Sequence, residues 1–255
     1  MHRGLAVAVV VPAYGEARLL PRMLRRLPAW VDAVYVVDDA SDDGTAEAAL
    51  AVGDPRLRVV RHSVNRGVGA AIATGYAAAL AAPADVVAVM AGDDQMDPGD
   101  LPSLLAPLAD GRADHVKGDR LAHPEARRMP LARRAGTRFL AGVTRAATGL
   151  RVHDSQCGYT ATTAACLRAL PLDDLWPRYG YPNDLLALLA RGGFRVAEVP
   201  VRPVYADEAS GLRPWHVVTI LAVIARRWGA GRAPGRPRRA GAPAGARFGR
   251  SPLAE

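Results

Sequence analysis

Short apolar runs alternate with helical patterns along the first half of this 255-residue chain, and this alternation restricts the fold more than any other feature. The first run, Leu5–Val11, is apolar at every position, which is typical of a strand buried on both faces. Pro12 and the polar residues after it favour a strand that ends in a loop over a signal peptide. The same alternation predicts further strands at Ala33–Val37, Leu57–Arg61, Asp85–Met90 and from Asp114, and helices at Ala17–Leu27, Thr45–Ala51, Gly69–Ala82 and Pro98–Leu108. Repeated strand–helix units predict an α/β fold with a mostly parallel sheet flanked by helices.

The second half is less regular and predicts three regions. Residues 1–212 are expected to form the α/β domain, which continues through helices at Met129–Thr148 and Asn183–Arg191 and strands at Gly158–Thr162 and Arg195–Val201. Residues 213–228 read as an amphipathic helix, too short to span a bilayer but suited to lie in a membrane interface. Residues 229–255, rich in Arg, Gly, Pro and Ala, are expected to be a disordered basic tail.

The net charge of +8 is concentrated in that tail. Eight of the 33 basic residues and one of the 25 acidic residues lie from Arg226 to Glu255, which leaves 25 basic and 24 acidic residues before them. The nearly neutral body disfavours nucleic-acid binding, because sequence-independent affinity needs several phosphate contacts. Two cysteines, Cys157 and Cys166, are too few for a disulfide scaffold or a cysteine-rich zinc site and fit a reducing compartment.

Four predicted strands are each followed by a loop rich in acidic residues or glycine. These loops are Pro12–Glu16, Asp38–Thr45, Asn65–Ala70 and Ala91–Pro98. Taken singly, each loop is explained by ordinary turn and helix-cap chemistry. Ligands of parallel sheets bind at the carboxyl ends of the strands, so the four loops are expected to share one site. Carboxylates there accept hydrogen bonds from a base or ribose and hold Mg²⁺ or Mn²⁺, and glycines let the backbone approach a sugar or phosphate.

These loops resemble those of the family 2 inverting glycosyltransferases, which have the Rossmann-like GT-A fold. VVVPAYGE resembles the V-P-x-Y-N-E opening of that family, and VVDDASDDGT resembles its V-D-D-x-S-x-D-G-T segment. NRGVGAAIATGY resembles its N-x-G-x-G-x-A-x-x-x-G-x segment, and VMAGDDQMDP its D-x-D-x-Q-x-D-P segment. The resemblance runs from about Leu5 to Val201, with the motifs in the family order.

Within this family the chain is most similar to the polyprenyl-phosphate sugar transferases of the dolichyl-phosphate mannose synthase type. HVKGDR resembles their strand that ends in G-x-R, and DSQCGYTA their D-x-x-x-G-[FY]-[KRT] segment. GYPNDLLALLARGGFRVAEVPVR resembles their stretch that ends in EVPV. The resemblance implies a metal-assisted, inverting transfer of a sugar from a GDP- or UDP-linked donor to a polyprenyl phosphate. It also implies a cytoplasmic enzyme of cell-envelope glycan synthesis, with peripheral contact at the inner face of the plasma membrane.

The resemblance also implies roles for individual residues. The nucleotide-sugar donor is expected to bind along a pocket lined by Pro12, Tyr14 and Glu16. Asp39, with its neighbour Asp38, is expected to bind the base or ribose. Asp93 is expected to bind the metal and the diphosphate, and Gln95 to lie near the sugar–phosphate junction. Arg120 and Arg202 are expected to bind phosphate on the donor or acceptor. Asp93 and Asp184 are the expected catalytic residues, and Asp93 is the expected ligand of Mg²⁺ or Mn²⁺.

The sequence departs from the family pattern in two places. Ala91 stands where the first carboxylate of D-x-D is expected, with Asp93 and Asp94 remaining. One or two carboxylates together with substrate phosphates are enough for Mg²⁺, so a metal role for Asp93 survives this change. Residues 205–210 are acidic where the dolichyl-type enzymes carry basic residues, which indicates a different acceptor end.

The role of Asp184 depends on the acceptor. A hydroxyl acceptor needs a general base within hydrogen-bond reach, and Asp184 would then supply it. A lipid phosphate is already anionic and needs no base, in which case Asp184 caps a helix or orients the acceptor. Two alternatives therefore stay open: transfer to a glycan or small-molecule hydroxyl, and, because of Ala91, a non-catalytic nucleotide-sugar-binding protein. The sequence leaves the sugar, the base and the oligomeric state undecided.

Overall fold

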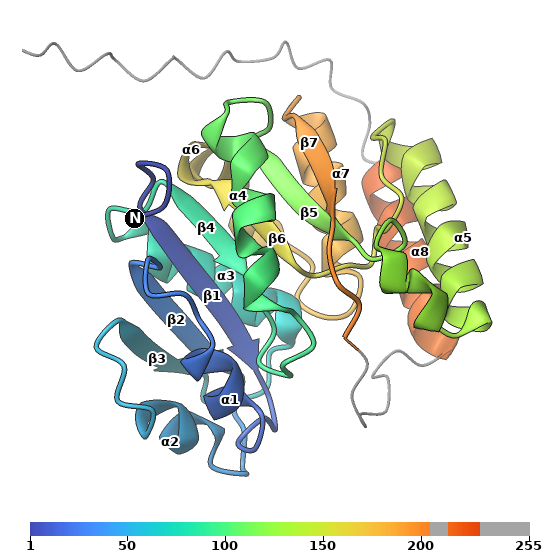
Figure 1. The fold of residues 1–255 in the computed structure, drawn as a ribbon. Helices are drawn as coiled ribbons and strands as arrows, with labels where there is room; N and C mark the ends of the chain where they lie inside the picture. The colour runs from blue at the N-terminus through green and yellow to red at the C-terminus, as the bar shows by residue number, and fades with distance from the viewer. Residues whose placement is uncertain (205–213, 230–255) are drawn as a thin grey trace, which may run out of the picture.

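A seven-stranded mixed sheet forms the centre of the molecule (Figure 1). The computed structural model describes residues 1–204 and 214–229. The strands are β1 (Val7–Ala13), β2 (Ala33–Asp38), β3 (Leu57–Arg61), β4 (Val86–Val89), β5 (His115–Asp119), β6 (Thr160–Thr163) and β7 (Val196–Pro200). They lie in the order β3-β2-β1-β4-β6-β5-β7, in which β6 runs antiparallel to both of its neighbours and the other pairs are parallel. The predicted mostly parallel α/β sheet is confirmed.

Helices cover both faces of this sheet, with α4 in front and α3 behind in Figure 1. The α-helices are α1 (Leu20–Arg25), α2 (Thr45–Leu50), α3 (Val68–Leu80), α4 (Leu101–Ala109), α5 (Leu131–Thr148), α6 (Ala164–Ala169), α7 (Tyr181–Arg191) and α8 (Pro214–Gly229). Short 3₁₀ turns lie at Pro98–Asp100, Pro124–Arg128 and Leu172–Asp174. Val9 of β1 packs in the layer of α1 and α4, whereas its neighbour Val10 packs in the layer of α3. Burial on both faces explains why the first strand is apolar at every position.

Most elements lie within a few residues of their predicted bounds, and the differences have local causes. β1 continues through Pro12, which the sequence analysis placed in the following loop. Proline has no N–H to donate, but the neighbouring strand β4 ends opposite Val10, so no hydrogen bond between β1 and β4 is lost at Pro12. α1 is shorter than predicted because the Glu16 carbonyl accepts hydrogen bonds from the amides of Leu19 and Leu20, which forms a turn first. The sequence analysis gave no prediction for the six-residue helix α6, which follows β6 directly, with Thr163 as the last residue of the strand and the cap of the helix.

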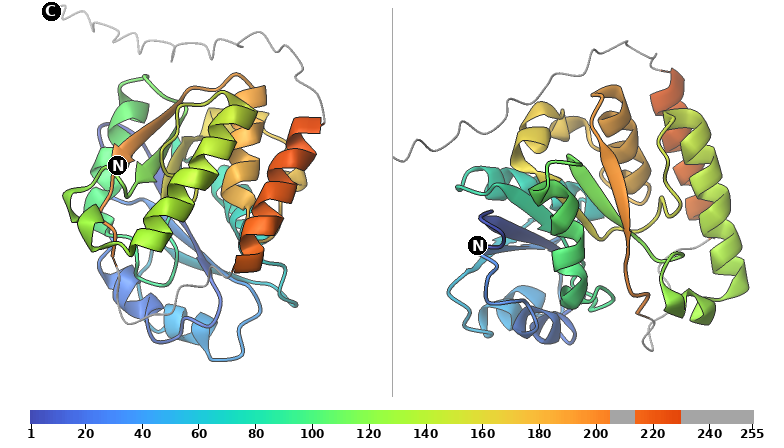
Figure 2. Two further views of the ribbon diagram at one scale, coloured as in Figure 1. Left: turned by 90° about the vertical axis from the view of Figure 1, so that its right-hand side faces the viewer. Right: turned by 45° about the horizontal axis from the view of Figure 1, so that its top comes forward.

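The C-terminal helix α8 lies beside α5 in both views of Figure 2 and also contacts α7. Its residues Ile220 and Ile224 are buried against Leu140 of α5. Much of the apolar face that the sequence assigned to a membrane interface is therefore covered by the protein itself. Among the described residues, none of the helices combines the length and the hydropathy that crossing a membrane requires. The predicted tail lies outside the described residues from residue 230 onward.

Candidate active site

A cleft of about 560 Å³ opens at the carboxyl ends of the central strands. The predicted donor-binding residues that line it are Pro12, Tyr14, Glu16, Asp39 and Asp93. They come from the ends of β1, β2 and β4, and Asn65 and Gly67 from the loop after β3 complete the wall. All four loops that the sequence singled out therefore meet in one cavity, as the position of binding sites on parallel sheets requires.

The adjacent carboxylates Asp38 and Asp39 point to different surroundings. Asp38 is fully buried and does not line the cleft; its Oδ1 accepts a hydrogen bond from the Ser41 amide and its Oδ2 lies 3.3 Å from the Arg61 Nε. Asp39 lines the cleft and accepts hydrogen bonds from the amides of Arg66 and Gly67 at 2.8 and 2.6 Å. Asp39 thus joins the ends of β2 and β3 at the wall of the cleft.

Much of the acidic loop after β2 organises the loop after β1. The Ser41 hydroxyl accepts a hydrogen bond from the Gly15 amide at 3.0 Å, and Thr45 Oγ1 accepts one from the Glu16 amide at 2.8 Å. Asp43 accepts a hydrogen bond from the Ala17 amide at 3.1 Å. These contacts fix the backbone of Tyr14 and Glu16, so the sequence signal of this loop reflects positioning of the cleft wall.

The glycines of the loop after β3 accommodate protein backbone. Gly67 has φ +95°, and a Cβ there would lie 2.5 Å from the Pro177 carbonyl oxygen. A Cβ on Gly69 would clash with the Trp176 carbonyl. The Ala70 amide donates a hydrogen bond to Pro177 at 3.1 Å. The sequence analysis expected these glycines to admit a sugar or phosphate; in the structure they admit the segment that carries Arg178 and Tyr179 into the cleft.

Asp93 lies at the junction of two cavities. It lines the cleft and also a smaller pocket of about 50 Å³ that contains Gln95, Arg120 and Arg202. Its Oδ1 accepts a hydrogen bond from the Gln95 amide at 3.1 Å. This carboxylate therefore faces the predicted donor residues on one side and the predicted phosphate-binding arginines on the other.

The neighbouring carboxylate, Asp94, is engaged by two arginines and does not line the cleft. It is 3% exposed and forms ion pairs with Arg22 and, at 2.9 Å, with Arg26. With Ala91 in the wall of the cleft, Asp93 is the member of this motif that faces the cavity. One carboxylate with open space beside it fits Mg²⁺ or Mn²⁺ that is shared with the phosphates of a ligand; an all-protein cage would need more ligands.

Arg120 is held in the small pocket by a fully buried partner. Its guanidinium forms a two-point ion pair with Asp154, at 2.7 and 3.0 Å. Burial alone would raise the pKa of Asp154, but the charge and hydrogen bonds of Arg120 outweigh burial and hold that pKa below its usual value. Arg202 lies at the same pocket, 3.3 Å from Glu125, and its side chain is about half exposed.

Asp184 is not brought to either cavity. It is 1% exposed and forms a two-point ion pair with Arg227 of α8, at 2.6 and 2.9 Å. It also accepts a hydrogen bond from the Trp176 amide at 2.9 Å. In this structure Asp184 fastens α8 and the segment before α7 to the domain.

Two further cleft residues had no sequence signal. Arg178 brings a positive charge into the cleft, and Thr219 of α8 closes its far wall. Arg178 sits in an irregular segment, and Thr219 lies 126 residues after Asp93, so only the folded chain brings them together. Tyr179 also lines the cleft and is 45% exposed.

Comparisons with known proteins agree with this geometry. The family model "Glycosyl transferase family 2" matches residues 8–163. The undecaprenyl-phosphate mannosyltransferase of Micrococcus luteus is 33% identical over 235 residues, covering 88% of this chain and 94% of that protein. The polyprenol monophosphomannose synthase of Mycolicibacterium smegmatis is 33% identical over 207 residues, covering 76% and 75%.

The fold is also similar to solved structures. Glucosyl-3-phosphoglycerate synthase from Mycobacterium tuberculosis, in complex with Mn²⁺ and UDP-glucose, superposes with a TM-score of 0.70 at 25% identity and covers 89% of this chain and 80% of that one. The family match begins in β1 and ends in β6, so it includes the cleft loops and Arg120, whereas Asp184, Arg202 and α8 lie beyond it.

Proposed function

Because the chain belongs to glycosyl transferase family 2 and is a glycosyltransferase, we propose that it moves a sugar, with inversion, from a nucleotide-sugar donor to a polyprenyl phosphate. The observation that carries this proposal is the position of Asp93 between the cleft and the arginine pocket. A donor in the cleft would have its diphosphate near Asp93, and an anionic acceptor at Arg120 and Arg202 would approach from the other side. In-line attack from that side inverts the anomeric centre.

The donor is proposed to occupy the 560 Å³ cleft. Pro12, Tyr14 and Glu16 form one wall for the nucleoside, and the Asp39 carboxylate at its base is an acceptor for base or ribose donors. Asp38 supports this wall from beneath through Ser41. GDP- and UDP-linked sugars both satisfy these contacts, so the identity of the donor is left to the experiment below.

Asp93 is proposed to hold Mg²⁺ or Mn²⁺ together with the donor diphosphate, and Gln95 to lie beside the sugar–phosphate junction. A divalent cation there would offset the charge that builds on the leaving nucleoside diphosphate. The solved structure with Mn²⁺ and UDP-glucose supports a divalent metal cofactor in general. Arg178, which also lines the cleft, adds fixed positive charge near the same phosphates.

The acceptor phosphate is proposed to bind at Arg120 and Arg202. Asp154 holds the Arg120 guanidinium in a fixed orientation, which limits the entropy lost when phosphate binds. An ionised phosphate is itself the nucleophile, so no base is required. The buried Asp184–Arg227 pair fits this proposal, because a carboxylate that is enclosed by an arginine and away from both cavities is poorly placed to accept a proton from a hydroxyl acceptor.

A second acceptor is worth testing, because the arginine pocket is small. The solved glucosyl-3-phosphoglycerate synthase binds phosphoglyceric acid, an acceptor that also carries phosphate. A short phosphorylated hydroxy acid would use the same arginines without a lipid. Transfer to such an acceptor would require a general base. The carboxylates among the described residues that line the two cavities are Glu16, Asp39 and Asp93.

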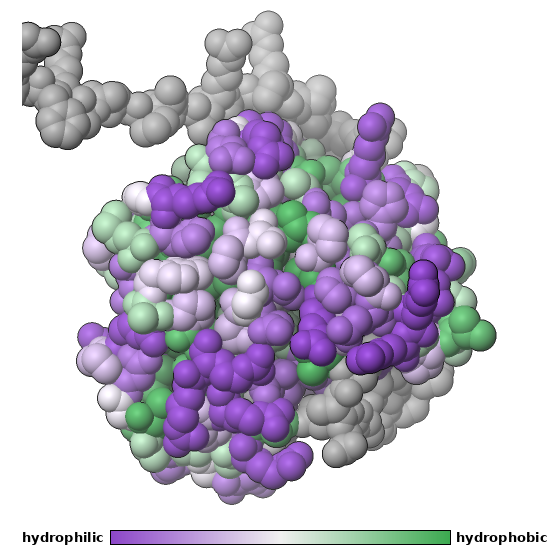
Figure 3. Space-filling view, viewed as in Figure 1, coloured by the Kyte–Doolittle hydropathy of each residue, from purple (hydrophilic) through white to green (hydrophobic). Residues whose placement is uncertain are grey.

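Membrane contact is proposed through α5 and α8, which extends the predicted 213–228 interface helix to its neighbour. Leu131 and Phe139 of α5 and Val218 of α8 are 78%, 57% and 69% exposed. Figure 3 shows a hydrophobic projection at the right-hand edge of the molecule, over α5, among hydrophilic side chains. Arginines beside exposed apolar residues favour an anionic lipid surface, which would place the enzyme at the cytoplasmic face of a membrane.

Purified full-length protein with Mg²⁺ or Mn²⁺, a panel of GDP- and UDP-sugars and a short polyprenyl phosphate tests the proposal. We expect release of nucleoside diphosphate that depends on the lipid, with one donor preferred. Release that depends on phosphoglyceric acid and not on the lipid would favour the soluble acceptor. Donor binding without release for every acceptor would favour the binding-only alternative, and restored turnover in Ala91→Asp would then identify the missing carboxylate as the cause.

A further inference from the structure

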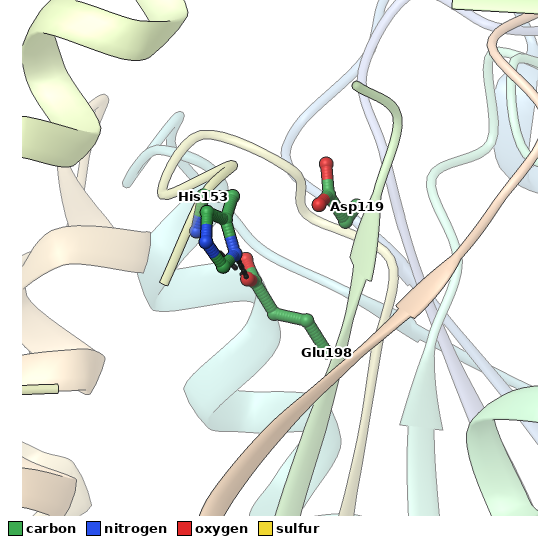
Figure 4. A group of neighbouring side chains, drawn as sticks. All are labelled: Asp119, His153 and Glu198. Carbon is green, nitrogen blue, oxygen red and sulfur yellow. Dashed lines mark hydrogen bonds and ion pairs between the residues drawn. The ribbon is translucent and has the colours of Figure 1, made fainter. Parts of the chain in front are cut away.

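Three side chains that could ligate a metal converge outside the proposed active site (Figure 4). Asp119 ends β5, His153 lies in the loop before β6, and Glu198 lies in β7. One ligand atom from each lies within 4.8 Å of the others. None of the three lines the cleft or the arginine pocket, so the cluster is separate from the metal position proposed at Asp93.

The hydrogen bonds in the cluster leave one oxygen of the Asp119 carboxylate without a donor among the described residues. Glu198 Oε2 accepts hydrogen bonds from His153 Nδ1 at 2.9 Å and from the backbone amide of His153 at 2.7 Å. Asp119 is 6% exposed, and its Oδ1 accepts the amides of Leu121 and Ala122 at 2.8 and 3.2 Å. No donor among the described residues reaches Asp119 Oδ2. Figure 4 shows this carboxylate beside the imidazole and the Glu198 carboxylate.

The local charge is mostly negative around Asp119. Asp119, Glu198 and Asp154 bring three carboxylates together, and the two nearby cations, Arg120 and Lys117, both lie against Asp154. Burial, followed by the charges of Glu198 and Asp154, raises the pKa of Asp119 above its usual value. A buried carboxylate among like charges costs free energy in its ionised form, and a bound cation would remove that cost.

We propose that Asp119, His153 and Glu198 bind a divalent transition-metal cation, of which Zn²⁺ is the best match, with water completing the coordination. One imidazole and two carboxylates are a donor set that suits Zn²⁺ and Co²⁺, whereas Mg²⁺ and Ca²⁺ prefer oxygen alone. His153 is exposed, so the metal can enter from solvent. Binding replaces the hydrogen bond between His153 Nδ1 and Glu198 with bonds from both groups to the metal. The imidazole binds as the neutral ring with its proton on Nε2, and only the second proton of an imidazolium leaves to solvent.

The metal would join three segments that are distant in sequence. It would tie the end of β5 to β7 and to the loop that carries Asp154, which orients Arg120. Metal binding is therefore expected to stabilise the folded chain and to keep the arginine pocket in its present arrangement. This role is structural, and it holds whichever sugar or acceptor the enzyme uses.

Metal titration of the tag-free, chelator-treated full chain tests this proposal. The Asp93→Ala background removes the other proposed metal ligand. In that background we expect one equivalent of Zn²⁺ by calorimetry and a visible absorption band with Co²⁺ that reports nitrogen and oxygen ligation. His153→Ala, a change at an exposed side chain, should weaken Zn²⁺ binding at least tenfold, whereas the control His2→Ala should not change it.

Thermal melting gives an independent readout. Zn²⁺ should raise the melting temperature of the Asp93→Ala protein and should not raise it once His153→Ala or Asp119→Asn is added. Asp119→Asn keeps an oxygen for the amides of Leu121 and Ala122, so it should fold without metal. Absence of Zn²⁺ binding in the Asp93→Ala protein, or binding that His153→Ala leaves unchanged, would overturn the proposal. Neither result depends on transfer activity, so each is distinguishable from a failure of the proposed function.

Discussion

The charged residues at the ends of β1, β2 and β4 differ from those around β5, β7 and α8 in what holds them. In the first region the cleft carboxylate Asp39 accepts two backbone amides and lies 2.7 Å from His62 Nδ1, and Asp93 accepts the Gln95 amide. The arginine-paired Asp38 and Asp94 do not line the cleft. In the second region, Arg120, Arg202 and Asp184 each have an ion-pair partner.

The two regions therefore differ in how their charged side chains are held before a ligand binds. The cleft carboxylates are oriented by backbone amides, with His62 also at Asp39, and they line the cavity in which a cation or a nucleoside would bind. An arginine fixed by a buried carboxylate is oriented in advance, but part of its charge is already compensated. We therefore expect the cleft to act through charge and the arginine pocket through orientation, and substitutions should separate the two.

The largest effect is expected at Asp93. Asp93→Ala should lower the rate of transfer on the order of 100-fold or more, because the cation that offsets the leaving group loses its protein ligand. The matched variant Asp94→Ala should keep most of the transfer rate and lower the free energy of unfolding by about 1 kcal/mol, since its partners are exposed arginines. Initial rates and urea denaturation measure the two effects. Equal losses of activity in both variants would contradict the distinction between these neighbours.

Arg120 should show a large effect on both stability and transfer. Arg120→Met leaves Asp154 buried without its partner and should cost about 3 kcal/mol of unfolding free energy. Arg120→Met with Asp154→Leu should recover most of that stability while transfer stays low, because the phosphate contact is still missing. Recovery of transfer in the double variant would show that Arg120 acts only through the fold.

A substitution at Asp184 should lower the free energy of unfolding and leave the rate of transfer nearly unchanged. Asp184→Asn should weaken the pair with Arg227 and lower the unfolding free energy by about 2 kcal/mol. Turnover with a lipid phosphate should stay within about twofold, with an unchanged pH profile, since a phosphate nucleophile requires no general base. A pH profile that loses its acidic limb in this variant would instead identify Asp184 as the base.

The smallest expected effect is a change of folding stability at acidic pH. The folded-state pKa of Asp154 lies below the usual aspartate value of 3.8, so its pair with Arg120 contributes full stability above that value and loses it as the pH falls through the folded pKa. In Arg120→Met, burial without the arginine raises the pKa of Asp154, so the stability difference between wild type and this variant should be largest near neutral pH. It should shrink as the pH falls, first through that raised pKa and then through the lowered pKa of the wild type. Urea denaturation of both proteins at pH 6 and pH 3 measures it. A difference that stays constant to pH 3 would contradict the assigned pair.

The sequence predicted which residues meet in the cleft better than it predicted the contacts of Arg120 and Asp184, and the reason is physical. Strand ends in a parallel sheet meet at one edge, so Pro12, Asp39 and Asp93 could be placed together from strand pattern alone. Contacts such as those between Arg120 and Asp154, 34 residues apart, or Asp184 and Arg227, 43 apart, leave no local pattern. For the same reason the opposite surroundings of Asp93 and Asp94 could not be read from the sequence, because remote arginines decide which one faces the cleft.

We infer that the acceptor is an anionic phosphate that reaches Asp93 from the arginine pocket. The decisive measurement is transfer from the preferred donor to a short polyprenyl phosphate, compared with transfer to the polyprenol that lacks the phosphate. We expect a glycosylated lipid, identified by mass spectrometry, with the phosphate only, and its loss in Arg120→Met with Asp154→Leu. Glycosylation of the polyprenol at an equal rate would contradict it.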